Sequence, residues 1–170
     1  LRQTAPPWYP VAAYLDKKGF TLYRNTQLHY LPTGEAYLDD MLTVLDTAQR
    51  FIFIEYFIMA EGQIWDRLSE ILCRKSRQGV EVKLIFDDFG SMMRMPNEKV
   101  EELQDAGVEV KVFNPVHHYV NRLYFNYRDH RKITCVDGDV AYTGGANIAD
   151  EYANLIERFG YWKDCGVRLE

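Results

Sequence analysis

The 170-residue chain is 47% hydrophobic and 14% aromatic, which suits one globular domain with a substantial core. Its net charge of -5 disfavours general nucleic-acid binding, so an anionic ligand would have to meet a local basic patch. The three cysteines have no metal-ligand spacing, which argues against a zinc site and a disulfide scaffold, and no apolar run reaches transmembrane length.

The first half of the chain predicts a strand–helix–strand–helix succession. Residues 1–10 are rich in proline and are expected to be extended, and residues 19–31 read as two short strands around a turn. Residues 33–50 show helical spacing of apolar positions behind a capping threonine. The run FIFIEYFI at 51–58 is typical of a central strand, and residues 64–78 form a second amphipathic pattern.

A short repeated segment, GVEVK, predicts parallel strands in the middle of the chain. GVEVKLIF at 79–86 and GVEVKVFN at 107–114 each follow a helical pattern, and each opening glycine suits a helix C-terminal cap. The order helix, glycine, strand is therefore expected twice, as in βα units that feed a parallel sheet. Residues 87–96 follow the first of these strands as a loop, and ligands of open α/β sheets gather at such ends.

The last third of the chain predicts a hairpin and a final strand. KITCVD and VAYTG read as two strands joined by a turn at Gly138-Asp139. A short helix is expected after Asn147, and residues 161–170 read as the last strand. Because no linker divides the sequence, residues 1–170 are expected to form a single domain.

Several polar residues gather in the string HRKITCVDGDVAYTGGAN at the hairpin. His130 and Lys132 lie two positions apart on a predicted strand, so their side chains project from one face. The pair suits a phosphate, because lysine binds its charge and histidine can attack phosphorus or carry a proton. Asn147 adds a neutral donor, and Gly144 and Gly145 allow the backbone to approach a ligand closely. By itself, H-x-K more often marks a solvated strand end.

The full string fits H-x-K-x4-D-x6-G-G-x-N and resembles the HKD motif of the phospholipase D superfamily. The second glycine position, often serine in that family, is Gly145 here. The segments FIFIEYFIMAEG, LIFDDFGS, NYRDHRKI, TGGANIADEY and YWKDCGVRLE resemble the first catalytic domain of bacterial cardiolipin synthases. The resemblance implies an α/β fold with a mixed, largely parallel β-sheet flanked by helices on both faces.

The resemblance also implies roles for the motif residues. His130 would be the nucleophile that forms a phosphohistidine, or the general acid that protonates the leaving alcohol. Lys132 and Asn147 would hold the non-bridging phosphate oxygens, so that the chemistry needs neither a metal nor another cofactor. Asp137 lies an odd number of positions beyond Lys132 on the predicted strand, so we expect it to face away from the site in a supporting role.

Other residues are weaker candidates for the site. Asp164 is the candidate carboxylate that orients the catalytic histidine, with Glu151 and a solvated strand end as the competing interpretations. Glu55 and Tyr56 either line a substrate pocket or make a hydrogen bond in the core. Arg128 belongs to a basic cluster at 117–134 that suits an anionic head group, or is simply a solvated basic turn.

The remaining histidines and a pair of aspartates are expected outside the chemistry. His117 and His118 are adjacent, so they are expected at the wall or rim of the site and not as metal ligands. Asp87 and Asp88 lack an accompanying phosphate loop and are also expected at the rim. None of the other histidines is followed by lysine two positions later, so the sequence carries one half-site.

The resemblance implies an enzyme that joins two phosphatidylglycerols into cardiolipin and releases glycerol. Its partners would be phosphatidylglycerol or another anionic phospholipid, and a second HKD motif from the full chain or a symmetric homodimer; nucleic acid is not an expected partner. Both termini look like cuts, so we expect a piece of a longer protein of the bacterial cell membrane that is soluble by itself. The alternatives are a homodimeric phospholipase D-like endonuclease and a non-catalytic module that binds anionic lipid.

Overall fold

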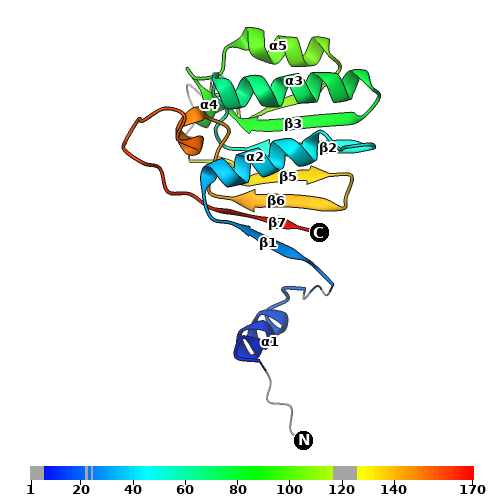
Figure 1. Cartoon of the computed structure of the whole chain (residues 1–170), viewed down its shortest axis with the longest axis vertical. Coiled ribbons are helices and arrows are strands. Elements are labelled where there is room, and N and C mark those ends of the chain that lie inside the picture. Colours follow the sequence, from blue (N-terminus) through cyan, green and yellow to red (C-terminus); the bar gives the residue numbers. More distant parts are fainter. Residues whose placement is uncertain (1–5, 22, 24, 117–125) are drawn as a thin grey trace, which may run out of the picture.

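The computed structural model describes residues 6–21, 23, 25–116 and 126–170. They contain a mixed seven-stranded sheet with the strand order β1-β7-β6-β5-β2-β3-β4 (Figure 1). The strands are β1 Leu28–Leu31, β2 Phe51–Tyr56, β3 Glu81–Asp87, β4 Glu109–Phe113, β5 Lys132–Val136, β6 Val140–Gly144 and β7 Gly166–Leu169. The α/β class and the mixed sheet expected from the sequence are confirmed.

The sheet has a parallel half and an antiparallel half. β2, β3 and β4 are parallel, as the repeated GVEVK segments predict. The pairs β2–β5, β5–β6, β6–β7 and β7–β1 are antiparallel, so the expected excess of parallel pairs is wrong. The reason is the short turn between β5 and β6, because so few residues can connect only antiparallel neighbours.

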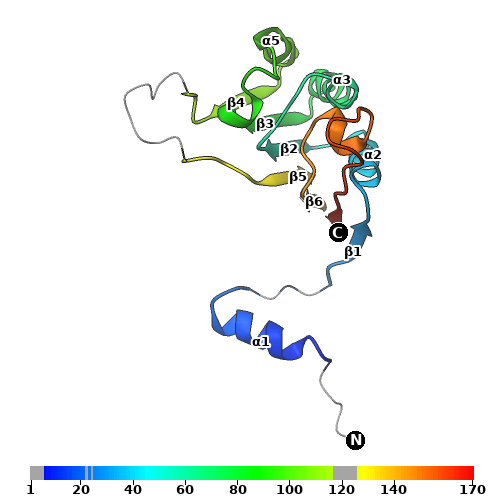
Figure 2. The ribbon, with the colours of Figure 1, turned by 90° about the vertical axis from the view of Figure 1, so that its left-hand side faces the viewer.

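The long helices of the sheet domain lie together on one face. Figure 2 shows α2, α3 and α5 on the same side of the sheet, which differs from the expected helices on both faces. The opposite face carries no helix in the described ranges. The helices are α1 Tyr9–Lys17, α2 Gly34–Leu45, α3 Gln63–Arg77, the single turn α4 Asp88–Ser91, α5 Asn97–Asp105 and the 3-10 turn η2 Asp150–Ala153.

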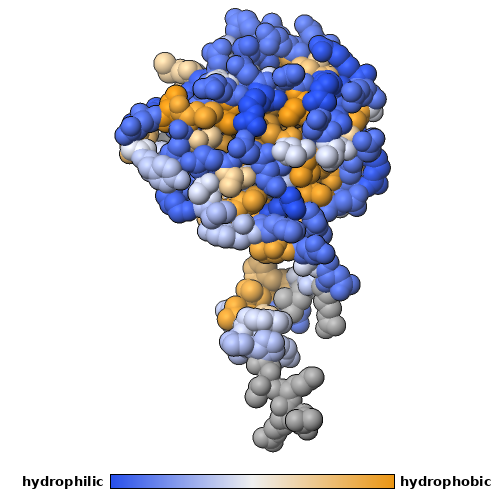
Figure 3. Space-filling view, in the orientation of Figure 1, coloured by the Kyte–Doolittle hydropathy of each residue, from blue (hydrophilic) through white to orange (hydrophobic). Residues whose placement is uncertain are grey.

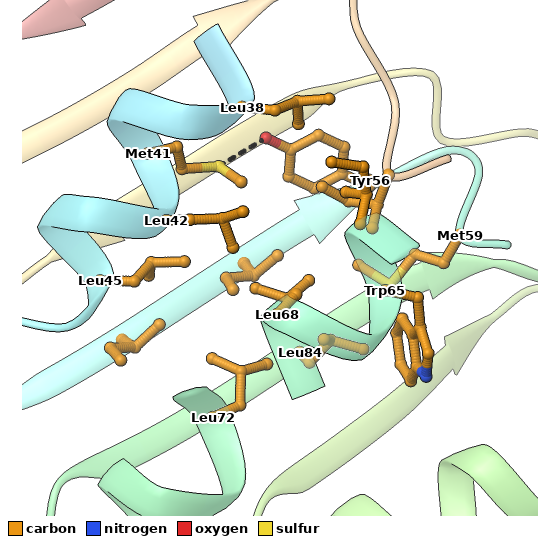
Figure 4. Close-up of a cluster of buried hydrophobic side chains, with 14 of the residues drawn as sticks. Leu38, Met41, Leu42, Leu45, Tyr56, Met59, Trp65, Leu68, Leu72 and Leu84 are labelled. Atoms are coloured by element: carbon orange, nitrogen blue, oxygen red, sulfur yellow. Dashed lines mark hydrogen bonds between the residues drawn. The ribbon is translucent and has the colours of Figure 1, made fainter. Parts of the chain in front are cut away.

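The core lies between this helical layer and the sheet. Along β2, Ile52, Ile54 and Tyr56 point towards the helices and are at most 3% exposed. Figure 4 shows the leucines of α2 and α3 in the layer between these helices and β2, which carries Tyr56. Phe53, which alternates with them, remains 36% exposed on the other face. The apolar residues of the FIFIEYFI run thus lie on both faces of β2, although only the face towards the helices is buried.

The N-terminal segment differs from the sequence-based expectation. Residues 9–17 form the helix α1 although an extended start was expected, because Pro10 occupies the first turn, where it costs no helical hydrogen bond. Of the two expected strands, the described residues include β1, which pairs with β7. Nowhere in the described parts of the chain is a helix both long and apolar enough to cross a membrane.

Backbone caps predicted from the sequence are confirmed. The Thr33 side chain accepts a hydrogen bond from Ala36 N at 3.2 Å and caps α2. Gly79 and Gly107 follow α3 and α5 with φ values of 91° and 94°, as the helix–glycine–strand pattern requires. Asp150 caps α3 from a distant part of the sequence, since its carboxylate accepts from Gln63 N and Ile64 N.

Asp137 has the supporting role expected for it, but it stands in the turn beyond β5 with φ 57°. Its carboxylate accepts hydrogen bonds from the backbone N–H groups of Gln49, Arg50 and Phe51 at 2.7–2.8 Å. These bonds hold the pKa of the Asp137 carboxyl below its usual value against the opposing effect of burial. The residue therefore ties the hairpin turn to the entry of β2.

The substitution Asp137→Ala is expected to lower the free energy of unfolding by about 2 kcal/mol, because three backbone donors lose a charged acceptor. Since the folded-state pKa of Asp137 is depressed, its contribution is present above about pH 4 and is lost as the pH falls through the folded-state pKa. Urea unfolding measures both effects. Asp139→Ala, at an exposed position of the same turn, is the control, and equal effects of the two substitutions would contradict the assignment.

Candidate active site

All the motif residues except Asp137 lie at one end of the strands, where β2 and β6 end and β5 and β7 begin. His130 and Lys132 enter β5, and Asn147 follows β6. Asp164 precedes β7, and Phe57 follows β2. Because β5 runs antiparallel to both of its neighbours, its first residues lie beside their last ones. The topology thus brings together residues that are far apart in the sequence.

The His130 imidazole is exposed and packs against an aromatic ring. Its ring centroid lies 4.7 Å from that of Phe57, and the two planes are tilted by 53°. The backbone carbonyl of His130 accepts a hydrogen bond from Lys132 Nζ at 2.7 Å. Within the described residues the imidazole itself has no hydrogen-bond partner. Its nitrogens are therefore available to a substrate.

Lys132 is a buried cation. The residue is 4% exposed, and its ammonium lies 5.3 Å from the centre of the Phe57 ring. Burial lowers the pKa of Lys132, whereas the charges of Asp164 and Asp129 raise it to a smaller extent. Across the residues that the structure describes, no carboxylate lies within ion-pair distance of this ammonium. The site therefore presents positive charge without a direct counter-ion.

The side-chain amide of Asn147 is held in place by a hydrogen bond to its oxygen. Its side chain is buried, and Oδ1 accepts a hydrogen bond from Ile58 N at 3.0 Å. Ile58 follows Phe57, so the amide is fixed to the same segment that supports the histidine. The other end, Nδ2, lies within hydrogen-bond reach of the Tyr152 hydroxyl, and it is the end that can donate to an anion.

Asp164 lies near the site without the hydrogen bond expected of an orienting carboxylate. Its Oδ1 accepts from Cys165 N at 2.8 Å, and its Oδ2 accepts from Trp162 Nε1 at 3.3 Å. No bond joins it to His130 in the structure. Its charge nevertheless raises the pKa of Lys132. Asp164 thus acts on Lys132 through its charge and not through a direct hydrogen bond.

The two glycines of the motif serve packing within the protein. A side chain at Gly145 would collide with the carboxylate of Asp164. A side chain at Gly144 would come within 2.7 Å of the carbonyl oxygen of Cys165. The close approach that they permit is therefore between β6 and the segment before β7. The close approach of a ligand to these glycines stays a prediction.

The backbone before His130 is anchored to Asp87, a fully buried aspartate. One carboxylate oxygen of Asp87 accepts from Asp129 N at 2.9 Å, and the other pairs with Arg128 Nη1 at 3.1 Å. Arg128 also donates to the carbonyl of Asn114. Its guanidinium is thus engaged within the protein, and a contact of Arg128 with substrate stays a prediction. Asp87, expected at the rim, is an internal anchor.

Glu55 belongs to an acidic pair beside the histidine. Its carboxylate lies 2.5 Å from Arg131 Nη2, and Arg131 also makes two side-chain contacts of 3.0 Å with Asp129. Burial and the neighbouring Asp129 raise the pKa of Glu55 to about 7, while Arg131 holds the pKa of Asp129 far below its usual range. The pair therefore shares its charge unequally, with Asp129 ionised and Glu55 protonated up to neutral pH.

Two other candidates are used inside the fold. Tyr56 is fully buried, and its hydroxyl lies 2.8 Å from that of Tyr37, so it does not line the site. Glu151 is buried against Arg94, which reaches both of its oxygens at 2.7 and 2.9 Å, and against Arg158 at 3.2 Å. It is therefore not the orienting carboxylate. The predictions for His117 and His118 lie outside the described residues.

Phe57 is the site residue that the sequence interpretation missed. It stands at the end of the apolar run FIFIEYFI, where it reads as one more core position. Its place directly after β2, at the edge where ligands of α/β sheets gather, was the available signal. Its contacts with both His130 and Lys132 could be seen only once β5 was known to pair with β2.

One protein-family model matches most of the sheet domain, including the motif. The family model described as "Cardiolipin synthase, PLD-like domain" matches residues 41–157, which include the whole HKD string. The chain belongs to this family. It is thus a cardiolipin synthase-like domain of the phospholipase D superfamily, as the sequence resemblance indicated.

Curated relatives agree with the family. A cardiolipin synthase of Oceanobacillus iheyensis is 36% identical over 86% of the chain, and one of Geobacillus kaustophilus is 38% identical over 85%. An uncharacterized protein of Streptococcus mutans is 43% identical over the whole chain. The chain covers 30%, 28% and 37% of these three proteins, about a third of their length.

Solved structures share the fold. The phospholipase D family member Nuc of Salmonella typhimurium matches 85% of the chain and 81% of its own, with a TM-score of 0.58 and 18% identity. A phosphatidylserine synthase of Haemophilus influenzae matches 84% of the chain and 33% of its own, with a TM-score of 0.64 and 16% identity. At these identities the likeness concerns the fold alone.

The substitution Lys132→Met is expected to raise the free energy of unfolding by about 1 kcal/mol, because a buried charge without a direct counter-ion costs more than an apolar chain of similar size. Urea unfolding of the 170-residue chain measures the change. Lys111→Met, at an exposed position on β4, is the matched control and should be neutral. A clear loss of stability in Lys132→Met would show that the ammonium is well paired in the free protein.

Proposed function

We propose that this chain supplies one catalytic half of a phosphatidyltransferase that joins two phosphatidylglycerols into cardiolipin and releases glycerol at the bacterial cell membrane. The observation that carries the proposal is the buried Lys132 ammonium, which lacks a direct counter-ion in the described structure and lies next to the exposed imidazole of His130. A phosphodiester placed there supplies the missing negative charge. The curated cardiolipin synthases support the choice of substrate.

In the proposed reaction His130 is the nucleophile. One imidazole nitrogen attacks phosphorus and forms an N–P bond, and the bond from phosphorus to the glycerol oxygen breaks. Lys132 and the amide nitrogen of Asn147 stabilise the charge on the non-bridging oxygens. A hydroxyl of the second phosphatidylglycerol then attacks phosphorus, and the N–P bond breaks.

Proton transfer requires a second acid–base group. The leaving glycerol oxygen takes up a proton, and the attacking hydroxyl gives one up in the second step. No second H-x-K string occurs in the 170-residue sequence. We therefore propose that the second histidine comes from another HKD motif, either in a longer natural chain or in a symmetric partner. Asp164 would keep Lys132 protonated despite its burial.

The surroundings of the site favour a lipid over a nucleic acid. Two loops that are tied to Glu151 through Arg94 and Arg158 expose large apolar side chains. A lipid substrate has apolar chains beside its phosphate, whereas a nucleic-acid backbone calls for further basic groups. The exposed side chains are Met92, Met93, Leu155, Ile156 and Phe159.

The substitution His130→Ala in the natural protein is expected to reduce cardiolipin formation from phosphatidylglycerol at least about a thousandfold, because the nucleophile is removed. Glycerol release and lipid chromatography measure the two products. His29→Ala is the matched control, since His29 lies on β1, outside the HKD string, and its imidazole is 3.8 Å from the carboxylate of Glu170. Full activity of His130→Ala would refute the proposal.

The two alternative functions have distinct outcomes in the same assay series. DNA cleavage by the 170-residue chain, together with a dimer in solution, would indicate the endonuclease. Binding of phosphatidylglycerol without either product, in the natural protein, would indicate a non-catalytic lipid-binding module.

A further inference from the structure

The helix α1 stands apart from the rest of the structure. It spans Tyr9–Lys17, and none of its residues is buried. Figures 1 and 2 show it away from the sheet and from the helical layer. In Figure 3 the protruding segment carries orange and pale atoms on its surface. Its exposed large apolar side chains, with those of its flanks, are Trp8, Tyr9, Val11, Tyr14, Leu15, Phe20 and Tyr23.

Such a segment needs a surface to cover it. A helix of nine residues is too short to be stable by itself in water, and it gains stability from an apolar contact. Exposed apolar patches of this kind mark interaction sites. The segment is also rich in tryptophan and tyrosine, which favour an apolar surface with a polar boundary over a uniformly apolar core.

The charge of the N-terminal segment differs from that of the whole chain. Residues 1–24 contain four basic residues, including Lys17 and Lys18, and a single acidic one, Asp16, although the whole chain has a net charge of -5. An anionic surface therefore attracts this segment and repels the remainder. The sheet face that the long helices leave uncovered has no comparable excess of positive charge at Lys83, because Glu109 lies beside this lysine.

We infer that α1 binds flat on a bilayer that contains anionic phospholipid, with its aromatic side chains at the level of the head groups. The helix is about 14 Å long, so it lies on the membrane and does not span it. The inference deepens the proposed function, on which it rests, by giving the chain its own contact with the surface that holds the substrate. Aromatic and basic side chains in one short helix are the composition of an interfacial anchor.

The connection to the sheet sets how close the catalytic domain stays. Residues 18–27 join α1 to β1, which begins at Leu28. Fully extended, a segment of this length reaches about 35 Å. A docked α1 therefore keeps the domain within about one domain diameter of the lipid surface, so that a substrate need not leave the bilayer to meet His130.

Vesicle co-sedimentation of the 170-residue chain tests the inference. We expect binding to vesicles of phosphatidylcholine with phosphatidylglycerol and at least about tenfold weaker binding to phosphatidylcholine alone. The double substitution of Trp8→Ser with Tyr14→Ser should weaken binding at least about tenfold, because two interfacial aromatic anchors are lost. Val112→Ser, at an exposed apolar position on β4, is the matched control and should bind as the unaltered chain does.

The inference would be overturned by undiminished binding of the double variant, by equal binding to both kinds of vesicle, or by loss of binding only in Val112→Ser. A monomer–dimer change in the double variant without any vesicle binding would assign α1 to a second copy instead, and would also overturn it. Turnover of phosphatidylglycerol in detergent micelles by the natural protein separates the two proposals. Vesicle binding without turnover refutes the proposed function alone, and micellar turnover without vesicle binding refutes the anchor alone.

Discussion

The site depends on a lysine ammonium that the fold buries without a direct counter-ion among the described residues. Removing a charge from water is costly, and hydrogen bonds and groups of opposite charge offset the cost. The carbonyl of His130 and the ring of Phe57 supply part of the compensation for Lys132, and the charge of Asp164 supplies more from a distance. A phosphate that enters the site would supply the negative charge that Lys132 lacks. Binding energy would then be gained at the place where the reaction occurs.

The topology of the sheet delivers this arrangement. The strand β5 is inserted antiparallel between β2 and β6, which places its first residues against the ends of both neighbours. Three buried or partly buried carboxylates then fix the segments that carry the chemistry. Asp87 holds the backbone before His130, Asp137 holds the far end of the hairpin, and Asp150 holds α3. These aspartates accept hydrogen bonds from backbone donors, and none of them is bonded to the His130 imidazole.

Much of the fold could be predicted because the decisive patterns are local. The repeated GVEVK segments predict two parallel strands, and the resemblance of the string from His130 to Asn147 to the HKD motif predicts a phosphodiester site. What remained unpredicted depends on pairing between distant segments. Whether Tyr56 faces the site or the core follows from the register of β2, and Arg128 is occupied only because Asp87 lies beside it. No local pattern contains that information.

The most direct test of the account is detection of the covalent intermediate on His130. The natural protein is mixed with phosphatidylglycerol, quenched in alkali during the first turnover and digested, and its peptides are examined by mass spectrometry. The account predicts a phosphatidyl adduct, or its deacylated remnant, on the peptide that contains His130, and no adduct there in His130→Ala. An adduct confined to a histidine outside this chain, with none on His130, would contradict the role of His130 as nucleophile.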